Sequence, residues 1–188
     1  MRLAVALVHH PVLDREGQVV TTAVTNLDVH DFARSARTYG VTDVFVVHPI
    51  AAQRELVTRI RDHWTQGSGK KRIPDRADAL ELVRIVPSLD DAYAALGGRD
   101  HVEAWTTAAS ARGGPLSSFA EARARLAGEG TALLMFGTGW GLARELVAGA
   151  AVRLAPIRAR ADTGWNHLSV RAACAIALDR LAGDATST

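Results

Sequence analysis

The sequence predicts an α/β fold, in which a mostly parallel sheet of five or six strands carries helices on both faces. Two observations support this class. Residues 3–8, 44–47 and 133–136 are short, continuous apolar runs, which is typical of strands buried on both faces. Segments whose apolar residues recur at helical spacing lie between such runs, so strands and helices alternate along the chain.

In the first part of the chain, turn and cap residues mark where these elements begin and end. The run 3–8 is followed by a turn signal at 14–17 and by β-prone residues at 19–22. Asn26 or Asp28 is suited to cap a helix that Gly40 is placed to end. We therefore expect strands at 3–8 and 44–47, helices from 26 or 28 to 39 and at 51–64, and a flexible basic loop at 67–72.

The second part of the chain continues the alternation to its end. Gly97-Gly98 is placed to close one helix, and residues 155–165 form a long loop before the last helix. No linker or internal repeat is visible, so residues 1–188 are expected to form a single domain. Strands are expected at 84–86, 102–105, 133–136 and 152–154, and helices at 77–83, 90–96, 119–126, 142–147 and 167–181.

Composition narrows the class of protein. Hydrophobic residues make up 48% and charged residues 22%, as in a folded soluble protein rather than a disordered one. No apolar run approaches the roughly 20 residues that span a bilayer, and the first strand lacks the cleavage-site pattern of a signal peptide. The single Cys174 excludes an internal disulfide and suits a reducing cytoplasm. The net charge of +2 is compatible with nucleic-acid binding without indicating it.

A glycine-rich turn, Gly137-Thr138-Gly139-Trp140-Gly141, follows the apolar run 133–136 and precedes a helical segment. In open α/β sheets, ligands bind at the carboxyl ends of the strands, where glycines let them approach the main chain closely. This turn is therefore a candidate ligand site. The alternative is a tight connection that binds nothing.

Two further strand ends have the same character, Thr106-Thr107-Ala108 and Leu154-Ala155-Pro156-Ile157. Small residues and prolines leave main-chain N–H and C=O groups accessible at such ends, and these groups can hydrogen-bond an adenine without any charged triad. The sequence thus places three candidate binding segments after three late strands.

Several common motifs are absent from the sequence. Ser68-Gly69-Lys70 lacks the upstream Gly and the following Ser or Thr of a P-loop. The Gly137-Thr138-Gly139 turn follows a late strand and precedes arginines, which counts against a dinucleotide fingerprint. No His pair joins Cys or carboxylates at metal-ligand spacing, and no nucleophile elbow occurs. His9-His10 is interpreted as an ordinary strand end and Cys174 as an inert core residue.

Three stretches, in their order, resemble the SPOUT class of RNA methyltransferases: residues 136–142, 154–157, and 166–171 before an Ala-rich helix. The spacing of Asp28, Arg34 and Gly40 is similar to the first motif of that class. With residues 21–28 added, the chain looks like a small bacterial subgroup related to tRNA guanine-N1 methyltransferases. The resemblance covers nearly the whole chain.

The resemblance implies a C-terminal deep trefoil knot that binds S-adenosylmethionine in a bent shape, RNA (tRNA or rRNA) as substrate, a homodimer and no metal. Arg34 is then expected at the catalytic centre, and Asp162 is the candidate base. The alternatives are a helix-surface salt bridge for Arg34, a surface turn for Asp162 and a solvated surface loop for the basic residues 70–72. Phosphates are expected at Lys70, Lys71, Arg72, Arg158 and Arg160, and the cofactor at Thr106, Thr107, Ala108, Phe136, Gly137, Thr138, Gly139, Trp140, Gly141, Leu154, Pro156, Ile157, Asn166, His167, Leu168 and Ser169.

The chain also departs from the class. Gly139-Trp140 stands where the class has a Glu, and Asp28 stands where many relatives have Asn. Two other functions therefore remain open. One is an S-adenosylmethionine-binding, RNA-associated protein that has lost catalysis, and the other is an unrelated α/β enzyme that uses a nucleotide cofactor.

Overall fold

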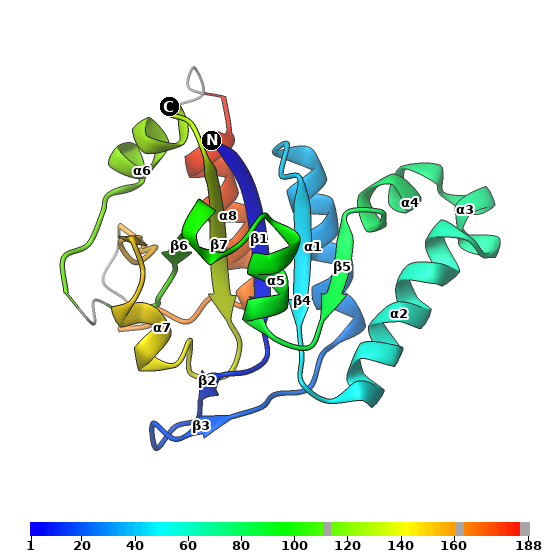
Figure 1. Ribbon diagram of the computed structural model, residues 1–188, viewed down its shortest axis with the longest axis horizontal. Coiled ribbons are helices and arrows are strands. Elements are labelled where there is room, and N and C mark those ends of the chain that lie inside the picture. The colour runs from blue at the N-terminus through cyan, green and yellow to red at the C-terminus, as the bar shows by residue number, and fades with distance from the viewer. Residues whose placement is uncertain (111–113, 161–163, 185–188) are drawn as a thin grey trace.

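A six-stranded sheet with strand order β5-β4-β1-β7-β6-β8 forms the centre of the protein, and every neighbouring pair in it is parallel. The computed structural model describes residues 1–110, 114–160 and 164–184. The predicted α/β class with a mostly parallel sheet is thus confirmed (Figure 1). The strands are β1 (Arg2–Val8), β4 (Asp43–Val47), β5 (Val83–Val86), β6 (Val102–Thr106), β7 (Thr131–Gly137) and β8 (Val152–Arg153).

Helices cover both faces of this sheet because its strands are apolar on both. In β1, Leu3, Val5 and Leu7 join one core cluster, while the alternate residues Ala4, Ala6 and Val8 join the other. The first cluster packs under α1 (Asn26–Thr38), α2 (Ala51–Thr65), α4 (Pro74–Leu80), α6 (Phe119–Leu126) and α8 (Val170–Ala182). The second packs under α5 (Leu89–Ala95) and α7 (Arg144–Ala148), and a 3-10 turn, Arg99–His101, precedes β6.

The register of the central strands brings chain-distant residues together at the carboxyl edge of the sheet. Val8 pairs with Gly137 and with Val47, so the ends of β1, β7 and β4 are level. Thr106 pairs with Met135 on one side and Arg153 on the other, which adds the ends of β6 and β8. All the predicted binding segments that follow strands therefore lie at one edge.

A small hairpin of β2 (Val12–Leu13) and β3 (Val19–Val20) lies at this same edge (Figure 1). The N–H of Leu13 donates to Gly141 O at 2.8 Å, and the N–H of Trp140 donates to Leu13 O at 2.9 Å. The hairpin is therefore bonded directly to the glycine-rich turn.

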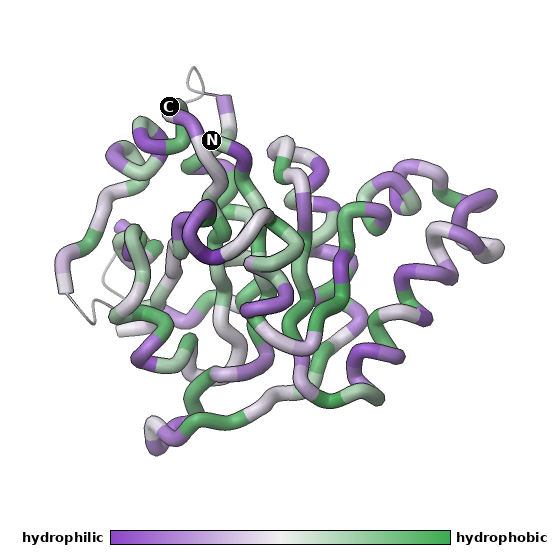
Figure 2. The backbone as a smooth tube through the Cα atoms, viewed as in Figure 1, coloured by the Kyte–Doolittle hydropathy of each residue, from purple (hydrophilic) through white to green (hydrophobic). Residues whose placement is uncertain are grey.

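The predicted flexible loop at 67–72 is wrong, because Ser68–Arg72 forms a short helix, α3. It packs with α2 and α4 in an arm that extends beyond β5, and purple hydrophilic segments line much of that arm (Figures 1 and 2). Packing against Trp64 explains why Ser68–Arg72 forms a helix instead of a flexible loop. A Cβ on Gly69 would lie 2.6 Å from the Trp64 ring, so the glycine lets α3 close onto the indole.

Cap residues explain two differences in helix boundaries. The last helix begins at Val170 rather than at 167, because the Ser169 hydroxyl accepts from the N–H of Ala172 at 3.2 Å and caps it. Thr25 rather than Asn26 or Asp28 caps α1, since its hydroxyl accepts from the N–H of Asp28 at 3.2 Å. Within the described part of the chain, no helix is both long and apolar enough to cross a bilayer.

Candidate cofactor and substrate site

The glycine-rich turn is packed so closely that only glycine fits at two of its positions. A Cβ on Gly137 would lie 2.5 Å from Leu142 N, and one on Gly139, where φ is +59°, would lie 2.8 Å from Leu13 O. The turn's amides are partly occupied by the protein itself. The N–H groups of Thr138, Trp140 and Gly141 donate to Val8 O, Leu13 O and Thr138 O. A ligand would therefore meet the turn's other main-chain groups.

The ends of β6 and β8 are held level with this turn by main-chain bonds. Thr107 donates to Met135 O from both its N–H (3.3 Å) and its hydroxyl (3.0 Å), while Leu154 N–H donates to Thr106 O at 2.9 Å. Thr106 and Leu154 are buried, whereas Ala108, Pro156 and Ile157 are half-buried at the edge. The three predicted strand-end segments therefore lie on neighbouring strands.

The segment after β8 is attached to both ends of the connection between β6 and α6. Ser117 donates to Arg153 O at 2.8 Å and accepts from the N–H of Ala155 at 2.8 Å. Further along, the Asn166 amide donates to Ala109 O at 2.9 Å. Asn166 thus lies against the residues that follow β6, and all four predicted residues 166–169 are exposed.

A buried polar cluster joins the turn to the ends of β1 and β4, and sequence reasoning missed it. His9 and His48 are both buried, and their rings stack at 5.3 Å between centroids. Thr22 Oγ1 contacts His9 Nδ1 at 3.0 Å and also bonds the hydroxyl of Thr138. The interpretation of His9-His10 as an ordinary strand end therefore overlooked the contact of His9 with the candidate site. Two adjacent histidines after a strand are only a weak sequence signal for such a contact.

Burial sets the protonation of these histidines. Desolvation, with help from His48, lowers the pKa of His9 from 6.5 to about 4. Desolvation also lowers the pKa of His48, whose Nε2 bonds Thr22 O at 2.9 Å while its Nδ1 accepts from the N–H of Ile50 at 3.2 Å. Both side chains are neutral at physiological pH, so the cluster works by hydrogen bonding and not by charge. Burial raises the pKa of the Cys174 thiol, in line with its predicted inert core role.

A second feature that the sequence did not suggest links the N-terminal turns of α1 and α8. Arg171 Nη1 lies 3.0 Å from Asp28 Oδ1, and Arg171 Nε lies 3.2 Å from Asp31 Oδ2. The Asp28 side chain is only 7% exposed and also accepts from the Thr25 hydroxyl at 2.6 Å. Asp28 therefore holds Arg171 and a cap residue together at the carboxyl edge.

The structure does not bring all predicted substrate residues together. Arg34 is exposed on α1, about 12 Å along the helix axis from the first residue of α1. Arg158 and Arg160 are exposed beyond β8 at one sheet edge. The exposed Lys70, Lys71 and Arg72 lie in the arm beyond β5 at the opposite edge, where Lys70 Nζ is 3.7 Å from Glu81. Asp162 lies outside the described residues.

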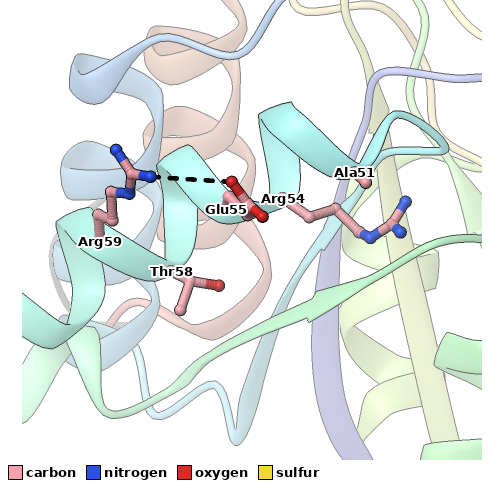
Figure 3. A pocket seen from close by; sticks show the side chains of 5 residues that line it. All are labelled: Ala51, Arg54, Glu55, Thr58 and Arg59. Carbon is pink, nitrogen blue, oxygen red and sulfur yellow. Dashed lines mark ion pairs between the residues drawn. The ribbon is translucent and has the colours of Figure 1, made fainter.

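A surface hollow of about 430 Å³ does not coincide with these segments. It lies along α2 and is lined by Ala51, Arg54, Glu55, Thr58 and Arg59, with Arg59 and Glu55 forming an ion pair between successive turns of this helix (Figure 3). The side chain of Arg54 is turned toward the end of β4, where its Nη1 donates to His48 O at 2.9 Å. Among the described residues, no three His, Cys, Asp or Glu side chains gather as they would around a metal ion.

The donor set at the strand ends suits an uncharged, heteroaromatic ligand. Ala108, Gly137, Gly141, Ala155 and Pro156 have small or apolar side chains, so polar contacts to a ligand there would come from main-chain groups that are not already bonded within the protein. Such groups can recognise the edge of an adenine.

Comparison with known proteins identifies the family. The family model described as "SAM-dependent RNA methyltransferase" matches residues 2–183. The chain belongs to this family. Among curated proteins, a tRNA (guanine-N(1)-)-methyltransferase of Nitratidesulfovibrio vulgaris is 42% identical over 95% of this chain and 41% of its own length. A second such enzyme, of Oleidesulfovibrio alaskensis, is 41% identical over 96% of this chain and 42% of its own. The chain thus spans less than half the length of these two relatives.

Other relatives place the fold of this family member among solved methyltransferases. An uncharacterized protein of Aquifex aeolicus is 35% identical over 94% of this chain and 86% of its own. TrmJ from Z. mobilis has a TM-score of 0.61 at 19% identity, covering 98% of this chain and 70% of that one. The SpoU methyltransferase AviRb from Streptomyces viridochromogenes has a TM-score of 0.55 at 17% identity, over 96% and 58%. The expected resemblance to SPOUT-class RNA methyltransferases is confirmed at the level of family and sheet.

Proposed function

We propose that this chain transfers a methyl group from S-adenosylmethionine to tRNA. The observation that carries the proposal is that three strand ends, 106–108, 137–141 and 154–157, lie side by side in a chain of this family. Their small side chains leave main-chain groups to bind a ligand. Relatives named tRNA (guanine-N(1)-)-methyltransferase favour guanine N1 as the acceptor, and other tRNA or rRNA positions, including ribose oxygens, are the wider class.

In this proposal the cofactor supplies an activated methyl on a sulfonium, and the protein supplies alignment. The three strand ends and residues 166–169 hold the adenosine through main-chain groups. Asp162 takes the proton that the acceptor nitrogen loses, and Arg34 stabilises the negative charge that develops on the base. No metal is needed for such a transfer.

We propose that residues 1–188 form a single domain and that its C-terminus is threaded into a trefoil knot. The bonds of Ser117 to residues 153–155 and of Asn166 to Ala109 support the knot, since they hold the last segment against both ends of the β6–α6 connection. From there α8 passes to a position in contact with both α1 and α6. Drawing the C-terminus through that connection would produce this arrangement.

We also propose a homodimer. Arg34 is exposed and lies about 12 Å along the α1 axis from the first residue of that helix, so its side chain is accessible to a partner subunit. Arg158 and Arg160 beside the strand ends, and Lys70, Lys71 and Arg72 on the arm, would contact RNA phosphates. Exposed indoles at the same edge, Trp140 (61% exposed) and Trp165 (75%), provide surfaces on which RNA bases can stack.

An S-adenosylmethionine-binding, RNA-associated protein without catalysis is the second candidate. One observation favours it: Trp140 stands where the class has a Glu, and its main chain is bonded to the hairpin residue Leu13. The glycine-rich turn therefore differs from that of the class on the side that would face the substrate.

Calorimetry with S-adenosylmethionine and its demethylated product tests the cofactor site before any substrate is known. Methyl incorporation into total RNA from a deletion strain then tests catalysis. Binding with incorporation into tRNA supports the main proposal, and binding without incorporation supports the second candidate. Absence of binding to either compound contradicts both.

A further inference from the structure

The cluster of His9, Thr22 and Thr138 contains a hydrogen-bond chain whose direction can be deduced. Thr138 Oγ1 lies 3.1 Å from the carbonyl oxygen of Val8, and a carbonyl oxygen can only accept. The single hydrogen of the Thr138 hydroxyl is therefore assigned to Val8. The contact between the two hydroxyls then requires Thr22 to donate to Thr138.

That assignment uses the only hydrogen of the Thr22 hydroxyl. The 3.0 Å contact between Thr22 Oγ1 and His9 Nδ1 can then be a hydrogen bond only if the Nδ1–H of His9 donates. The reverse direction would leave the oxygens of Thr138 and Val8 facing each other without a hydrogen. His9 is thus the neutral Nδ1–H tautomer, and every contact in the chain is satisfied.

The tautomer leaves His9 Nε2 as a bare acceptor, and this atom is buried without a hydrogen-bond partner among the described residues. A buried polar atom without a partner is unfavourable, and an apolar side chain at this position would avoid it. The hydrogen bond that His9 makes through its other nitrogen, Nδ1, must therefore offset this cost. Through Thr22, that bond is connected to Thr138 in the glycine-rich turn.

We propose that His9 is a positioning residue for the cofactor-binding turn, acting through Thr22 on Thr138. The Nδ1–H of His9 orients the Thr22 hydroxyl, which orients the Thr138 hydroxyl toward Val8, and Thr138 N–H also donates to Val8 O at 3.2 Å. Two bonds from Thr138 to one carbonyl fix the start of the turn relative to β1. This inference rests on the proposed function only where it concerns S-adenosylmethionine.

The test compares two substitutions that differ in where they present a donor. In His9→Asn the side-chain N–H₂ takes the place of Nδ1–H, whereas in His9→Gln it takes the place of Nε2. Thr138→Val removes the far end of the chain while keeping the side-chain shape. In each variant, amide hydrogen exchange at residues 137–141 is measured without ligand, and affinity for S-adenosylmethionine is measured by calorimetry.

We expect exchange of the turn amides to rise at least tenfold in His9→Gln and Thr138→Val and to stay within threefold of wild type in His9→Asn. Cofactor affinity should fall at least fivefold in the first two variants and be restored in His9→Asn. Nitrogen-15 NMR of the wild type should show the Nδ1–H tautomer. An Nε2–H tautomer, or equal exchange in the Asn and Gln variants, overturns the inference. A wild type that shows the tautomer and the exchange pattern but binds no S-adenosylmethionine contradicts the proposed function and leaves the positioning chain intact.

Discussion

The guanidinium of Arg171, on α8, lies 3.0 Å from the carboxylate of Asp28, on α1, although 143 positions separate the two residues. The Asp28 side chain is 7% exposed, so the pair is largely removed from water. The same guanidinium reaches Asp31 at 3.2 Å. Arg171 therefore joins the start of α1, where Asp28 begins the first motif of the family resemblance, to the start of α8, which follows residues 166–169.

Replacing Arg171 with Ala should destabilise the protein, because it leaves the buried Asp28 carboxylate without its ion partner. Removing one partner of a fully buried pair costs about 3–5 kcal/mol. Since Arg171 is 30% exposed and Thr25 still bonds Asp28, we expect about 1–3 kcal/mol by urea unfolding. Affinity for S-adenosylmethionine should fall as well, since the start of α8 would lose its ion pairs with α1.

Arg59→Ala is the matched control for this substitution. Arg59 is 81% exposed and lies 3.8 Å from Glu55, so its removal should change stability by less than about 0.5 kcal/mol. Equal effects of the two substitutions would show that the bridge between α1 and α8 contributes nothing specific.

Gly139→Ala should disrupt the glycine-rich turn where it meets the hairpin. The backbone has φ +59° there, which costs a non-glycine residue about 1–2 kcal/mol, and the new Cβ would lie 2.8 Å from Leu13 O. Overpacking adds about 1–3 kcal/mol. We therefore expect a loss of about 2–5 kcal/mol by urea unfolding, together with loss of cofactor binding by calorimetry.

Gly40→Ala separates the backbone cost of Gly139→Ala from its overpacking cost. Gly40 has φ +71°, but a Cβ added there would have nothing within 4 Å, so only the backbone cost of about 1–2 kcal/mol applies. A Gly139→Ala protein no less stable than Gly40→Ala would mean that the turn yields to the hairpin without strain.

Features set by local pattern could be predicted from the sequence. The run 119–126 becomes a helix with those same bounds because Ser118 and Glu121 form a capping box at its start. The buried strands follow from continuous apolar runs. The helix α3 was not predictable in this way, since Ser68–Arg72 contains no apolar face and depends on Gly69 packing against Trp64.

The candidate site likewise has features that could be predicted from the sequence and features that could not. Its three strand ends are recognisable as segments because glycine, proline and small residues follow apolar runs. The partners of His9 depend on the register of β1 against β4 and β7, and the Asp28–Arg171 pair depends on how α8 packs on α1. No short window of sequence contains either relationship, so neither could be predicted.

Acid should destabilise the protein in a window set by His9. Its pKa is about 4 in the folded state and 6.5 ordinarily, so between these values the unfolded chain binds more protons than the folded one. The free energy of unfolding should therefore fall as the pH is lowered from about 6.5 to about 4, by up to about 3 kcal/mol from this residue. Burial of His48 acts in the same direction.

The measurement is urea unfolding at a series of pH values, compared between wild type and His9→Asn. Carboxylates titrate in both proteins, whereas only the wild type has the His9 proton. We expect the variant to lose part of the pH slope, up to one proton, between pH 6.5 and 4. Identical slopes would mean that His9 is not buried as a neutral base in solution.

The two basic groups at opposite edges of the sheet should contribute separately to RNA binding. Lys70, Lys71 and Arg72 are exposed on the arm, and Arg158 and Arg160 are exposed beside the strand ends. Removing one phosphate-binding side chain reduces the slope of log affinity against log salt by about 0.7 for single-stranded RNA. Replacing the arm triplet with Ala should therefore lower the slope by up to about 2, and replacing the Arg pair by up to about 1.4.

Filter binding of tRNA across a salt series measures these slopes, with Arg59→Ala as the control on the same arm. Affinity for S-adenosylmethionine should be unchanged in the triplet variant, because the arm lies beyond β5 and the strand ends of the candidate site belong to β6, β7 and β8. If the triplet variant binds every RNA with the wild-type affinity and salt slope, the arm is a solvated surface and RNA is held elsewhere. If only the Arg158 and Arg160 substitutions reduce the slope, the phosphates run along the β8 edge.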